Sequence, residues 1–322
     1  MRRVSYYEHG GPDVLTLEEV DVPVPGPGQV LVRVEAIGTN FVDTKIRRGE
    51  GALFRRPLPG RPTGDVVGTV DAVGPDVDPG QIGLRIATLA EDAYADFVLA
   101  DALWLAPVPE GLDIGSASML PMGAPVALRT LRTGALAPGE TVLIHAAAGG
   151  IGHLAVQLAK LHGTTVIATV GSAAKADFAR ECGADFAVDY TDADWADQVR
   201  SCAPLGVDVV LDSVGGETLR RSFDVLAPYG RIVVYGAASG DLEDVSVRNL
   251  FELKSVAGFS LMAWRTARRE QARAEMAEVS EHFTAGRLRT TVHATLPLAE
   301  AAEAHRLLEN RSTRGRVLLV TS

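Results

Sequence analysis

A glycine-rich stretch in the middle of the chain has the residue types that bind a phosphate group. It covers residues 145–153 and places Ala146, Gly149 and Gly152 in the pattern Ala-x-x-Gly-x-x-Gly. A continuous apolar run precedes it and an amphipathic segment follows it, as expected where a buried strand passes into a helix. Glycines let the backbone approach an anion, and the N–H groups at a helix start point toward it. We expect a dinucleotide pyrophosphate to lie against the backbone of Ala148, Gly149, Gly150 and Ile151.

The end of the next expected strand indicates which dinucleotide binds. A site for NAD places Asp or Glu about 20 residues after the glycines, where it binds the ribose 2′-hydroxyl. Here residues 169–175 read Thr-Val-Gly-Ser-Ala-Ala-Lys, without a carboxylate that would repel a 2′-phosphate. Ser172 can donate a hydrogen bond and Lys175 can supply charge, although a helix cap and a surface lysine are ordinary roles for them. We therefore expect NADPH, with Gly171, Ser172 and Lys175 near its 2′-phosphate.

Strand and helix patterns alternate around this stretch. The expected strands are residues 141–146, 165–169, 186–189, 207–211, 231–235 and 256–259. The expected helices between them are residues 150–161, 173–182, 195–202 and 217–226. This alternation is typical of an α/β domain with a doubly wound parallel sheet.

The chain before about Pro121 has a different pattern. Residues 30–37, 66–73 and 95–99 nearly alternate apolar and polar side chains, as strands with one buried face do. Segments rich in Pro and Gly separate them, which predicts a barrel-like or sandwich-like β domain. At the other end, a charged helix over residues 264–284 and the elements 291–295, 298–309 and 316–320 are expected to return to this β domain.

Composition and motifs exclude several classes of protein. The 322 residues suggest two domains, and 31 basic against 41 acidic residues give a net charge of −10. Such a charge disfavours nucleic acid and anionic membrane surfaces as partners. The uncharged run 141–159 is long enough for a membrane span, but its glycines, histidines and glutamine predict a soluble protein. There is no Gly-x-Ser-x-Gly elbow of a hydrolase and no Gly-Lys-Ser/Thr ending of a P-loop.

Two cysteines, Cys182 and Cys202, are too few for a disulfide framework or a four-cysteine zinc site. The first residues, Met-Arg-Arg-Val-Ser, are charged at once and lack the apolar core of a secretory signal. Together these features favour a reducing, cytoplasmic setting.

Further motifs are similar to those of one family along essentially the whole chain. The matching segments are residues 9–15, 36–44, 145–152, 169–175, 212–215, 235–240 and 304–311. In these segments the chain resembles the zinc-independent quinone oxidoreductases, the zeta-crystallin-like branch of the medium-chain dehydrogenase/reductase superfamily. The resemblance implies a GroES-like β-rich catalytic domain, residues 1–121 and 265–322, and a Rossmann domain, residues 122–264. It also implies NADPH between the two domains and a homodimer formed through the edge of the Rossmann sheet.

The resemblance assigns roles to individual residues as well. Tyr190 and Arg311 would flank the adenosine phosphate, and Asn40 and Asp43 would border the reacting end. The residues expected along the nicotinamide half are Gly236, Ala237, Phe259 and Leu261.

The same comparison with the superfamily predicts no metal. Its zinc alcohol dehydrogenases use a Cys near the position of Asn40 and a Gly-His-Glu segment, and here Gly64 replaces the histidine. The histidines form no group with metal-ligand spacing; they are His9, His145, His153, His162, His282, His293 and His305.

A chain without zinc ligands favours a small-molecule conjugated acceptor, in which the charge that develops on hydride transfer is delocalised. We consider Asn40 as hydrogen-bond donor and Asp43 with Lys45 as a proton relay; Asp43 could instead fix its loop and Lys45 could face solvent. Two segments on the substrate side depart from the family pattern. Pro125 lacks both a hydroxyl and an N–H, and residues 50–54 lack a tyrosine that relatives often carry.

Three functional hypotheses follow. The first is an NADPH-dependent quinone reductase. The second is an enoyl reductase for an enone or a 2-enoyl ester or thioester in a biosynthetic pathway. The third is a non-catalytic protein that binds NADPH in a structural or sensing role.

Replacement of Lys175 by alanine tests the choice of nucleotide. A charge-assisted hydrogen bond contributes about 1.5–3 kcal/mol, and about 1.4 kcal/mol corresponds to a tenfold change in affinity. We therefore expect Lys175→Ala to weaken NADPH binding roughly ten- to a hundredfold and to leave NADH binding nearly unchanged, as measured by titration of both nucleotides. Equal losses for the two nucleotides would refute the assignment.

Overall fold

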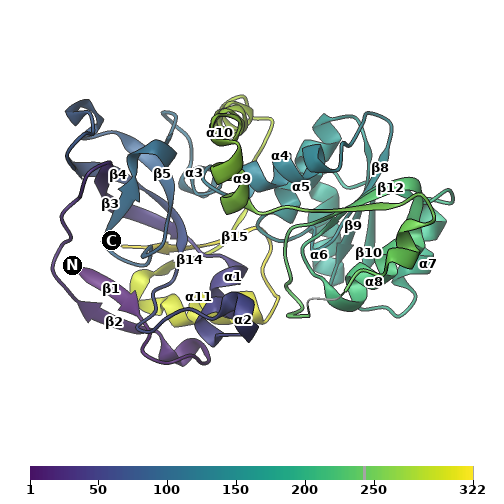
Figure 1. The fold of residues 1–322 in the computed structure, drawn as a ribbon, viewed down its shortest axis with the longest axis horizontal. Helices are drawn as coiled ribbons and strands as arrows, with labels where there is room; N and C mark the ends of the chain where they lie inside the picture. The colour runs from purple at the N-terminus through teal and green to yellow at the C-terminus, as the bar shows by residue number, and fades with distance from the viewer. Residues whose placement is uncertain (242–243, 322) are drawn as a thin grey trace. The chain divides into compact units, whose positions relative to one another are not determined.

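The computed structural model describes residues 1–241 and 244–321 (Figure 1). Leu242, Glu243 and Ser322, which the expected domain ranges include, lie outside the described residues. The chain forms two compact units. The first contains Met1–Met122, Met276–Ala285 and the chain from Arg289 onward; the second contains Gly123–Glu275 and Gly286–Leu288. The expected boundary at residue 264 falls within helix α9 (Leu261–Ala267), whereas the second unit continues to Glu275.

A seven-stranded sheet forms the centre of the first unit. Its order is β14-β15-β3-β4-β5-β7, with β6 also paired to β3, and all its pairs except parallel β14–β15 are antiparallel. The strands are β3 (Gln29–Gly38), β4 (Gly64–Val73), β5 (Arg85–Ala90), β6 (Phe97–Asp101), β7 (Ala106–Pro107), β14 (Val292–Pro297) and β15 (Arg316–Val320). A separate antiparallel pair consists of β1 (Arg2–Ser5) and β2 (Thr16–Glu19). The predicted β-rich domain is confirmed, and the C-terminal strands β14 and β15 belong to its sheet, whereas residues 264–275 of the expected charged helix belong to the second unit.

The second unit contains a fully parallel six-stranded sheet in the order β10-β9-β8-β11-β12-β13. Its strands are β8 (Thr141–Ile144), β9 (Thr165–Val170), β10 (Phe186–Asp189), β11 (Val207–Asp212), β12 (Leu226–Val234) and β13 (Ser255–Gly258). Numbered within the unit, the order is 3-2-1-4-5-6, the order of a Rossmann sheet. The doubly wound α/β fold is therefore confirmed.

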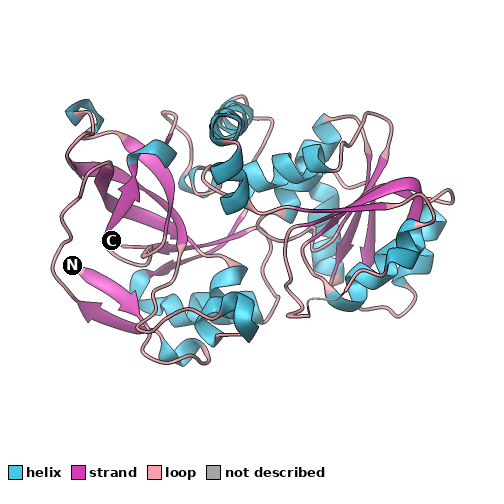
Figure 2. Ribbon diagram, viewed as in Figure 1, coloured by secondary structure: helices cyan, strands magenta, loops and turns pink. Residues whose placement is uncertain are grey.

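Helices cover both faces of this sheet, with α4 and α5 on one face and α7 and α8 on the other (Figure 2). The helices are α4 (Gly123–Thr133), α5 (Gly152–Leu161), α6 (Ala173–Glu181), α7 (Trp195–Cys202) and α8 (Gly216–Val225). Strands β8 and β11 are buried along almost their whole length, which explains their continuous apolar sequences. Among the described residues, no helix combines the length and the apolar character that crossing a membrane requires.

Two parts of the helical pattern differ from the expectation. The expected charged helix is two helices, α9 and α10 (Arg269–Thr284), because Arg268 has φ −142° and ψ 54°. The short helix α1 (Phe41–Arg48) was not expected, and its C-cap Gly49 has φ 65°, a conformation that glycine adopts readily. The remaining helices are α2 (Gly51–Phe54), α3 (Ile114–Ala117) and α11 (Ala301–Glu309), with short 3-10 turns at Pro12–Val14, Pro79–Gln81, Ala102–Trp104, Val247–Leu250 and Leu298–Glu300.

Candidate functional site

All the residues expected to bind the cofactor, except Arg311, lie at one edge of the second unit's sheet. All six strands are parallel, so their carboxyl ends lie along this edge. The chain continues from β8 to β9 on one side and from β11 to β12 on the other, so the strand order reverses between β8 and β11. The glycine stretch follows β8, and Gly171, Ser172 and Lys175 follow β9. Tyr190, Gly236, Ala237, Phe259 and Leu261 follow β10, β12 and β13. Arg311 belongs to the first unit.

The turn between β8 and α5 leaves no room for a side chain at Gly152. A Cβ atom there would lie 2.3 Å from the carbonyl oxygen of Ala146 and 2.8 Å from the Cα of Ala147. Ala146 itself has φ 50°, and its carbonyl accepts a hydrogen bond of 2.9 Å from the N–H of Gly149. The third position of the fingerprint is therefore glycine because helix α5 begins in contact with the backbone of the turn.

This turn presents free hydrogen-bond donors. Within the described residues, the N–H groups of Ala148, Gly150 and Ile151 donate to no backbone carbonyl. They stand directly before α5, where the helix dipole favours a negative charge. The geometry fits the pyrophosphate of a dinucleotide.

Among the residues expected at the adenosine end, the structure brings Gly171, Ser172, Lys175 and Tyr190 together. A Cβ atom on Gly171 would lie 2.8 Å from the Tyr190 hydroxyl, so the two residues are in close contact. Ser172 caps helix α6, and its hydroxyl accepts from the N–H of Lys175 at 3.4 Å. This is the ordinary capping role, and it leaves the hydroxyl proton of Ser172 available for donation to a phosphate.

A second turn lies at the same edge, after β11. The buried carboxylate of Asp212 accepts from the N–H groups of Val214, at 2.7 Å, and Gly215, at 3.1 Å. A Cβ on Gly236 would lie 2.8 Å from the carbonyl oxygen of Ser213, so the turns after β11 and β12 are packed together. The sequence marked residues 212–215 only as a family motif; the structure shows that they support Gly236.

A buried polar cluster in the first unit surrounds Asn40. The Asn40 Nδ2 donates to Asp65 Oδ2 at 3.1 Å, and Asn40 Oδ1 accepts from Arg316 Nη1 at 2.7 Å. Arg316 also forms an ion pair with Asp65, 251 residues away in the sequence. The guanidinium fits only because position 38 is glycine: a Cβ there would lie 1.8 Å from Arg316 Nη2. Sequence reasoning missed Asp65 and Arg316, and no local signal marks them as partners.

This cluster does not fit a zinc ion. Asn40 and Asp65 already bind the Arg316 guanidinium, whose charge would repel a metal cation, and Gly64 offers no ligand. Across residues 1–241 and 244–321, no group of three His, Cys, Asp or Glu side chains could hold a metal.

Asp43 is a buried carboxyl group with a strongly altered pKa. Its exposed fraction is 1%, and Oδ1 accepts from the N–H and hydroxyl of Thr63 at 2.9 and 2.8 Å. Oδ2 is buried and has no hydrogen-bond partner among the described residues. Burial raises the pKa of Asp43 to about 7, the charge of Asp65 adds to this, and the Thr63 hydrogen bonds oppose it. The group can therefore hold or release a proton near neutral pH.

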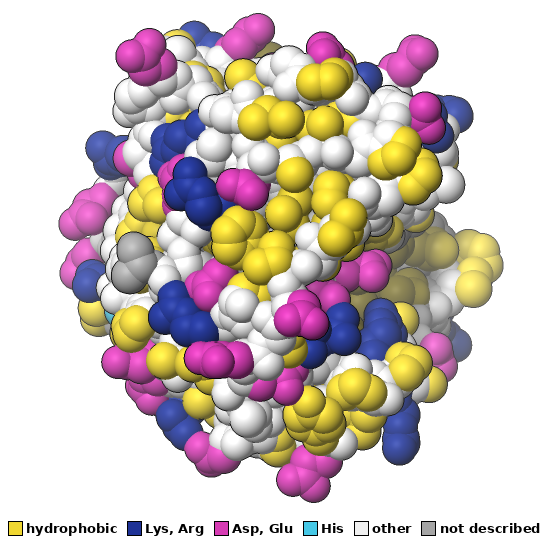
Figure 3. Space-filling view, turned by 90° about the vertical axis from the view of Figure 1, so that its left-hand side faces the viewer, with side chains coloured by type: hydrophobic (Ala, Val, Ile, Leu, Met, Phe, Trp, Pro, Cys, Tyr) yellow, Lys and Arg dark blue, Asp and Glu magenta, His cyan; other side chains and the backbone are white. Residues whose placement is uncertain are grey.

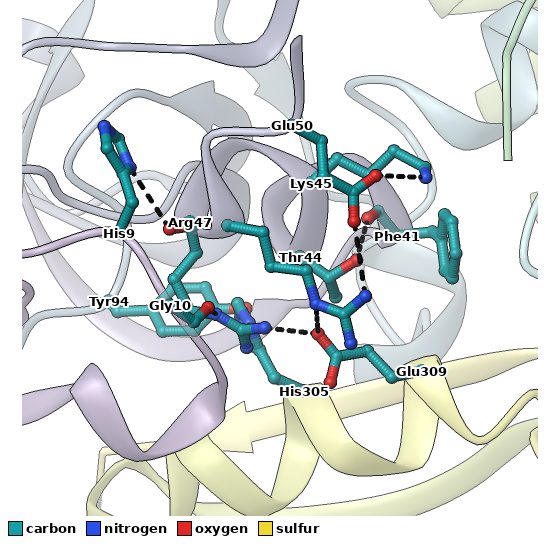
Figure 4. Close-up of polar contacts among 11 residues, drawn as sticks. His9, Gly10, Phe41, Thr44, Lys45, Arg47, Glu50, Tyr94, His305 and Glu309 are labelled. Carbon is teal, nitrogen blue, oxygen red and sulfur yellow. Dashed lines mark hydrogen bonds and ion pairs between the residues drawn. The ribbon is translucent and has the colours of Figure 1, made fainter. Parts of the chain in front are cut away.

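Lys45 does not contact Asp43. Its ammonium forms an ion pair of 2.7 Å with Glu50 and lies 5.6 Å from the centroid of the Phe41 ring (Figure 4). The structure thus brings Asn40 and Asp43 into one buried region of α1 and directs Lys45 elsewhere.

Helix α1 is fixed to α11 by a buried arginine (Figure 4). The Arg47 side chain is fully buried; its Nε donates to Gly10 O at 3.1 Å, and Nη2 forms an ion pair with Glu309. Its Nη1 lies 3.0 Å from Nδ1 of His305, whose Nε2 lies 3.1 Å from the Tyr94 hydroxyl. Arginine only donates, so Nδ1 accepts and Nε2 carries the proton.

Burial and the charge of Arg47 lower the pKa of His305 to about 3, so this histidine is neutral at ordinary pH. No local feature of the sequence marks His305 for a functional role. The structure shows that it helps to hold the helix that carries Asp43.

Acidic and basic side chains are intermixed over the face shown in Figure 3, with apolar side chains between them. This face has no extended basic area of the kind that binds nucleic acid.

Comparison with known proteins gives consistent matches. A model described as alcohol dehydrogenase GroES-like domain matches residues 26–110, and one described as zinc-binding dehydrogenase matches residues 150–281. A 2-haloacrylate reductase of a Burkholderia species is 38% identical, covering 98% of this chain and 97% of its own length. The structure of Escherichia coli quinone oxidoreductase complexed with NADPH has a TM-score of 0.92 at 32% identity, covering 100% of both chains. The structure of CurK enoyl reductase has a TM-score of 0.89 at 26% identity, covering 100% of this chain and 99% of its own.

Replacement of Asp43 by asparagine is expected to stabilise the protein increasingly as pH rises. The folded-state pKa of about 7 exceeds the ordinary 3.8, so the contribution of Asp43 is complete below pH 3.8 and is lost as pH rises through 7. Asparagine keeps an oxygen acceptor for Thr63 but does not ionise. At about 1.36 kcal/mol per pH unit, the free energy of unfolding of Asp43→Asn relative to wild type should rise by about 2–3 kcal/mol between pH 5 and pH 8.

Urea denaturation at several pH values measures this difference. Asp21→Asn, at an exposed carboxylate, is the matched control and should show no such change. A difference between Asp43→Asn and wild type that stays constant with pH would contradict the assignment.

Proposed function

Because the chain belongs to the zinc-independent quinone oxidoreductase branch of the medium-chain dehydrogenase/reductase superfamily, we propose that it reduces a conjugated carbonyl acceptor. The protein is an oxidoreductase, and its cofactor is NADPH. The observation that carries the proposal is the turn before α5, where free N–H groups meet a glycine that no other residue can replace without a clash.

Residues at the edge of the parallel sheet would hold the cofactor. The pyrophosphate lies against Ala148, Gly149, Gly150 and Ile151, whose N–H groups and helix dipole supply the attraction. The 2′-phosphate and adenosine are bound by Gly171, Ser172, Lys175, Tyr190 and Arg311. The nicotinamide half follows Gly236, Ala237, Phe259 and Leu261. Support comes from the contact of Gly171 with Tyr190 and from the packing of Gly236 on the turn after β11.

The first unit supplies the polar groups for the acceptor. NADPH, when bound, supplies a hydride. Asn40 uses one amide N–H on Asp65 and keeps the second for the acceptor oxygen. Arg316 orients this amide by donating to its oxygen, and Asp43 holds a proton in the same helix turn. The ammonium of Lys45 forms an ion pair with Glu50, so we assign the proton of this step to Asp43 rather than to an Asp43–Lys45 relay.

Reduction of an enoyl group is the second candidate activity. It is favoured by the relatives named 2-haloacrylate reductase and enoyl reductase, because both names describe a carbon–carbon double bond next to a carbonyl. The third candidate is a structural or sensing protein. It would bind NADPH but would not oxidise it with any acceptor.

Oxidation of NADPH with a panel of acceptors tests these functions. We expect loss of NADPH absorbance with quinones or with 2-enoyl esters and thioesters, and a rise in melting temperature of several degrees at about 100 times the Kd. Tight binding without any turnover would favour the sensing role, and an unchanged melting temperature would remove the basis for all three functions.

Asn40→Ala should lower kcat by roughly a hundredfold, because a hydrogen-bond donor to a developing oxyanion contributes about that factor.

We further propose a cytoplasmic homodimer formed through strand β13. The chain has only two cysteines, too few for a disulfide framework, in keeping with a reducing compartment. Strand β13 is the last strand of its sheet, and unpaired edges attract other strands. Beside it, a group of large side chains is exposed: Tyr229, Val247, Phe251 and Leu253. The N–H of Tyr229 donates to the carbonyl of Leu253, so these segments adjoin.

Substitution of Phe251 by glutamate tests the dimer. Phe251 is 82% exposed beside the edge strand, and a charge there opposes burial against a second copy. We expect Phe251→Glu to give a monomer by light scattering. Leu205→Glu, at a residue that is 90% exposed before β11, is the control and should leave the mass unchanged. A wild-type protein of 34.0 kDa in solution would contradict the proposal.

A further inference from the structure

The peptide unit between Gly149 and Gly150 carries one of the free N–H groups of the turn before α5. Neither flanking residue has a side chain, and neither has a positive φ, so the backbone angles do not require glycine here. Glycine has more conformational freedom than any other residue, and ordering it costs free energy. A contact that holds this peptide unit would therefore prepare the N–H of Gly150 for a phosphate before the nucleotide arrives.

The side chain of His153 makes such a contact. His153 is the second residue of α5 and has an exposed fraction of 0%. Its Nδ1 lies 2.9 Å from the carbonyl oxygen of Gly149, and its backbone N–H donates to the same oxygen at 3.1 Å. A carbonyl oxygen can only accept, so Nδ1 carries a proton, and both lone pairs of the oxygen are engaged.

The two hydrogen bonds also set the direction of the Gly150 N–H. The Gly149–Gly150 bond is trans, and a planar trans peptide directs its C=O and its N–H oppositely. Both donors come from α5, so the carbonyl of Gly149 faces this helix and the N–H of Gly150 points away from its start. That is the side on which the helix dipole attracts an anion. A bond at one end of the peptide plane thus aims the donor at the other end.

A neighbouring helix keeps the His153 ring in place. The ring of Phe178, a buried residue of α6, has its centroid 6.1 Å from that of His153, with 36° between the ring planes. A buried ring packed in this way has few alternative rotamers, so its Nδ1 stays directed at the Gly149 carbonyl. The N-cap of α6 is Ser172, which is expected at the 2′-phosphate. The contact therefore joins the two helices that begin at the expected phosphate positions.

His145, at the other end of the turn, is bonded differently. Its Nδ1 and Nε2 lie 2.8 Å from the hydroxyl oxygens of Thr169 and Ser222. The Ser222 hydroxyl donates its own proton to the carbonyl of Thr218 at 2.7 Å, so it accepts from His145 and the proton of His145 is on Nε2. This ring binds side chains of β9 and α8 and holds no peptide unit of the turn.

We propose that His153 is a positioning residue of the cofactor site, whose Nδ1–H holds the Gly149–Gly150 peptide so that the N–H of Gly150 faces the pyrophosphate. The inference rests on the proposed function, which places the pyrophosphate at this turn, and adds to it a residue outside the glycine fingerprint. His153 acts without touching the nucleotide, because the planar peptide transmits the orientation. Its effect is therefore confined to the pyrophosphate and does not extend to the 2′-phosphate.

Replacement of His153 by leucine and by asparagine separates the hydrogen bond from the volume of the side chain. The two replacements have nearly the same shape, but only asparagine keeps a donor, Nδ2, close to the position of Nδ1. We expect His153→Leu to raise the Kd of NADP⁺ about tenfold and His153→Asn to stay within about threefold of wild type, since one charge-assisted hydrogen bond is weakened.

The matched control is Gln157→Met. Gln157 is buried one turn further along α5, and its Nε2 donates to the carbonyl oxygen of His153 at 3.0 Å. The methionine variant therefore also loses a side-chain hydrogen bond to the backbone of this helix, without a change at the turn. Its Kd for NADP⁺ should equal that of wild type.

Adenosine 2′-phosphate distinguishes positioning from a general loss of structure. This ligand has no pyrophosphate, so calorimetric titration should give the same Kd with wild type and with His153→Leu. A variant that is merely less well folded would bind adenosine 2′-phosphate and NADP⁺ more weakly by the same factor. Equal losses for the two ligands, or equal Kd values of NADP⁺ for the leucine and asparagine variants, would overturn the proposal.

The proton on the His153 ring gives a readout from the wild-type protein, whether or not a variant folds. Long-range ¹H–¹⁵N NMR spectra should show a proton on Nδ1 of His153 and on Nε2 of His145, with the His153 signals assigned by their loss in His153→Asn. A His153 ring protonated only on Nε2 would overturn the proposal. Failure of the wild-type protein to bind NADP⁺ would instead contradict the cofactor site and, with it, the proposed function.

Discussion

The close approach of helix α5 to the turn that precedes it is the constraint on which the cofactor site depends. Gly152 stands where a Cβ would meet the carbonyl oxygen of Ala146, so the helix can begin directly against the turn. This contact directs the N–H groups of Gly150 and Ile151 away from backbone partners and toward the edge where six parallel strands end. The switch point of the 3-2-1-4-5-6 sheet lies at the same strand, β8, so backbone donors and sheet topology specify one location.

Buried charge organises the first unit in a different way. Arg316 reaches past Gly38 to bind Asp65 and Asn40, and Arg47 binds His305 and Glu309 between two helices. Each guanidinium has several fixed acceptors, which is the condition under which a buried cation is tolerated. Asp43 lacks such a cation at its second oxygen, and burial therefore shifts its pKa toward neutrality. Asp65 and Glu309, which are paired with arginines, therefore stabilise the fold, whereas Asp43 can exchange a proton.

The sequence by itself determined the two folds, the glycine turn and the end of β9, because these depend on short-range periodicity and on residues that are neighbours in the chain. Helix α1 was not predicted because its buried positions include Asp43, Lys45 and Arg47, so no apolar periodicity marks it in the sequence. Only the tertiary structure decided that Arg316 binds Asp65, that Arg47 binds His305, and that Lys45 turns to Glu50 rather than Asp43. The first two pairs join residues that are 251 and 258 positions apart in the sequence. No local sequence pattern predicts a contact between segments that only folding brings together. The same folding buries Asp43, and burial is what sets its pKa.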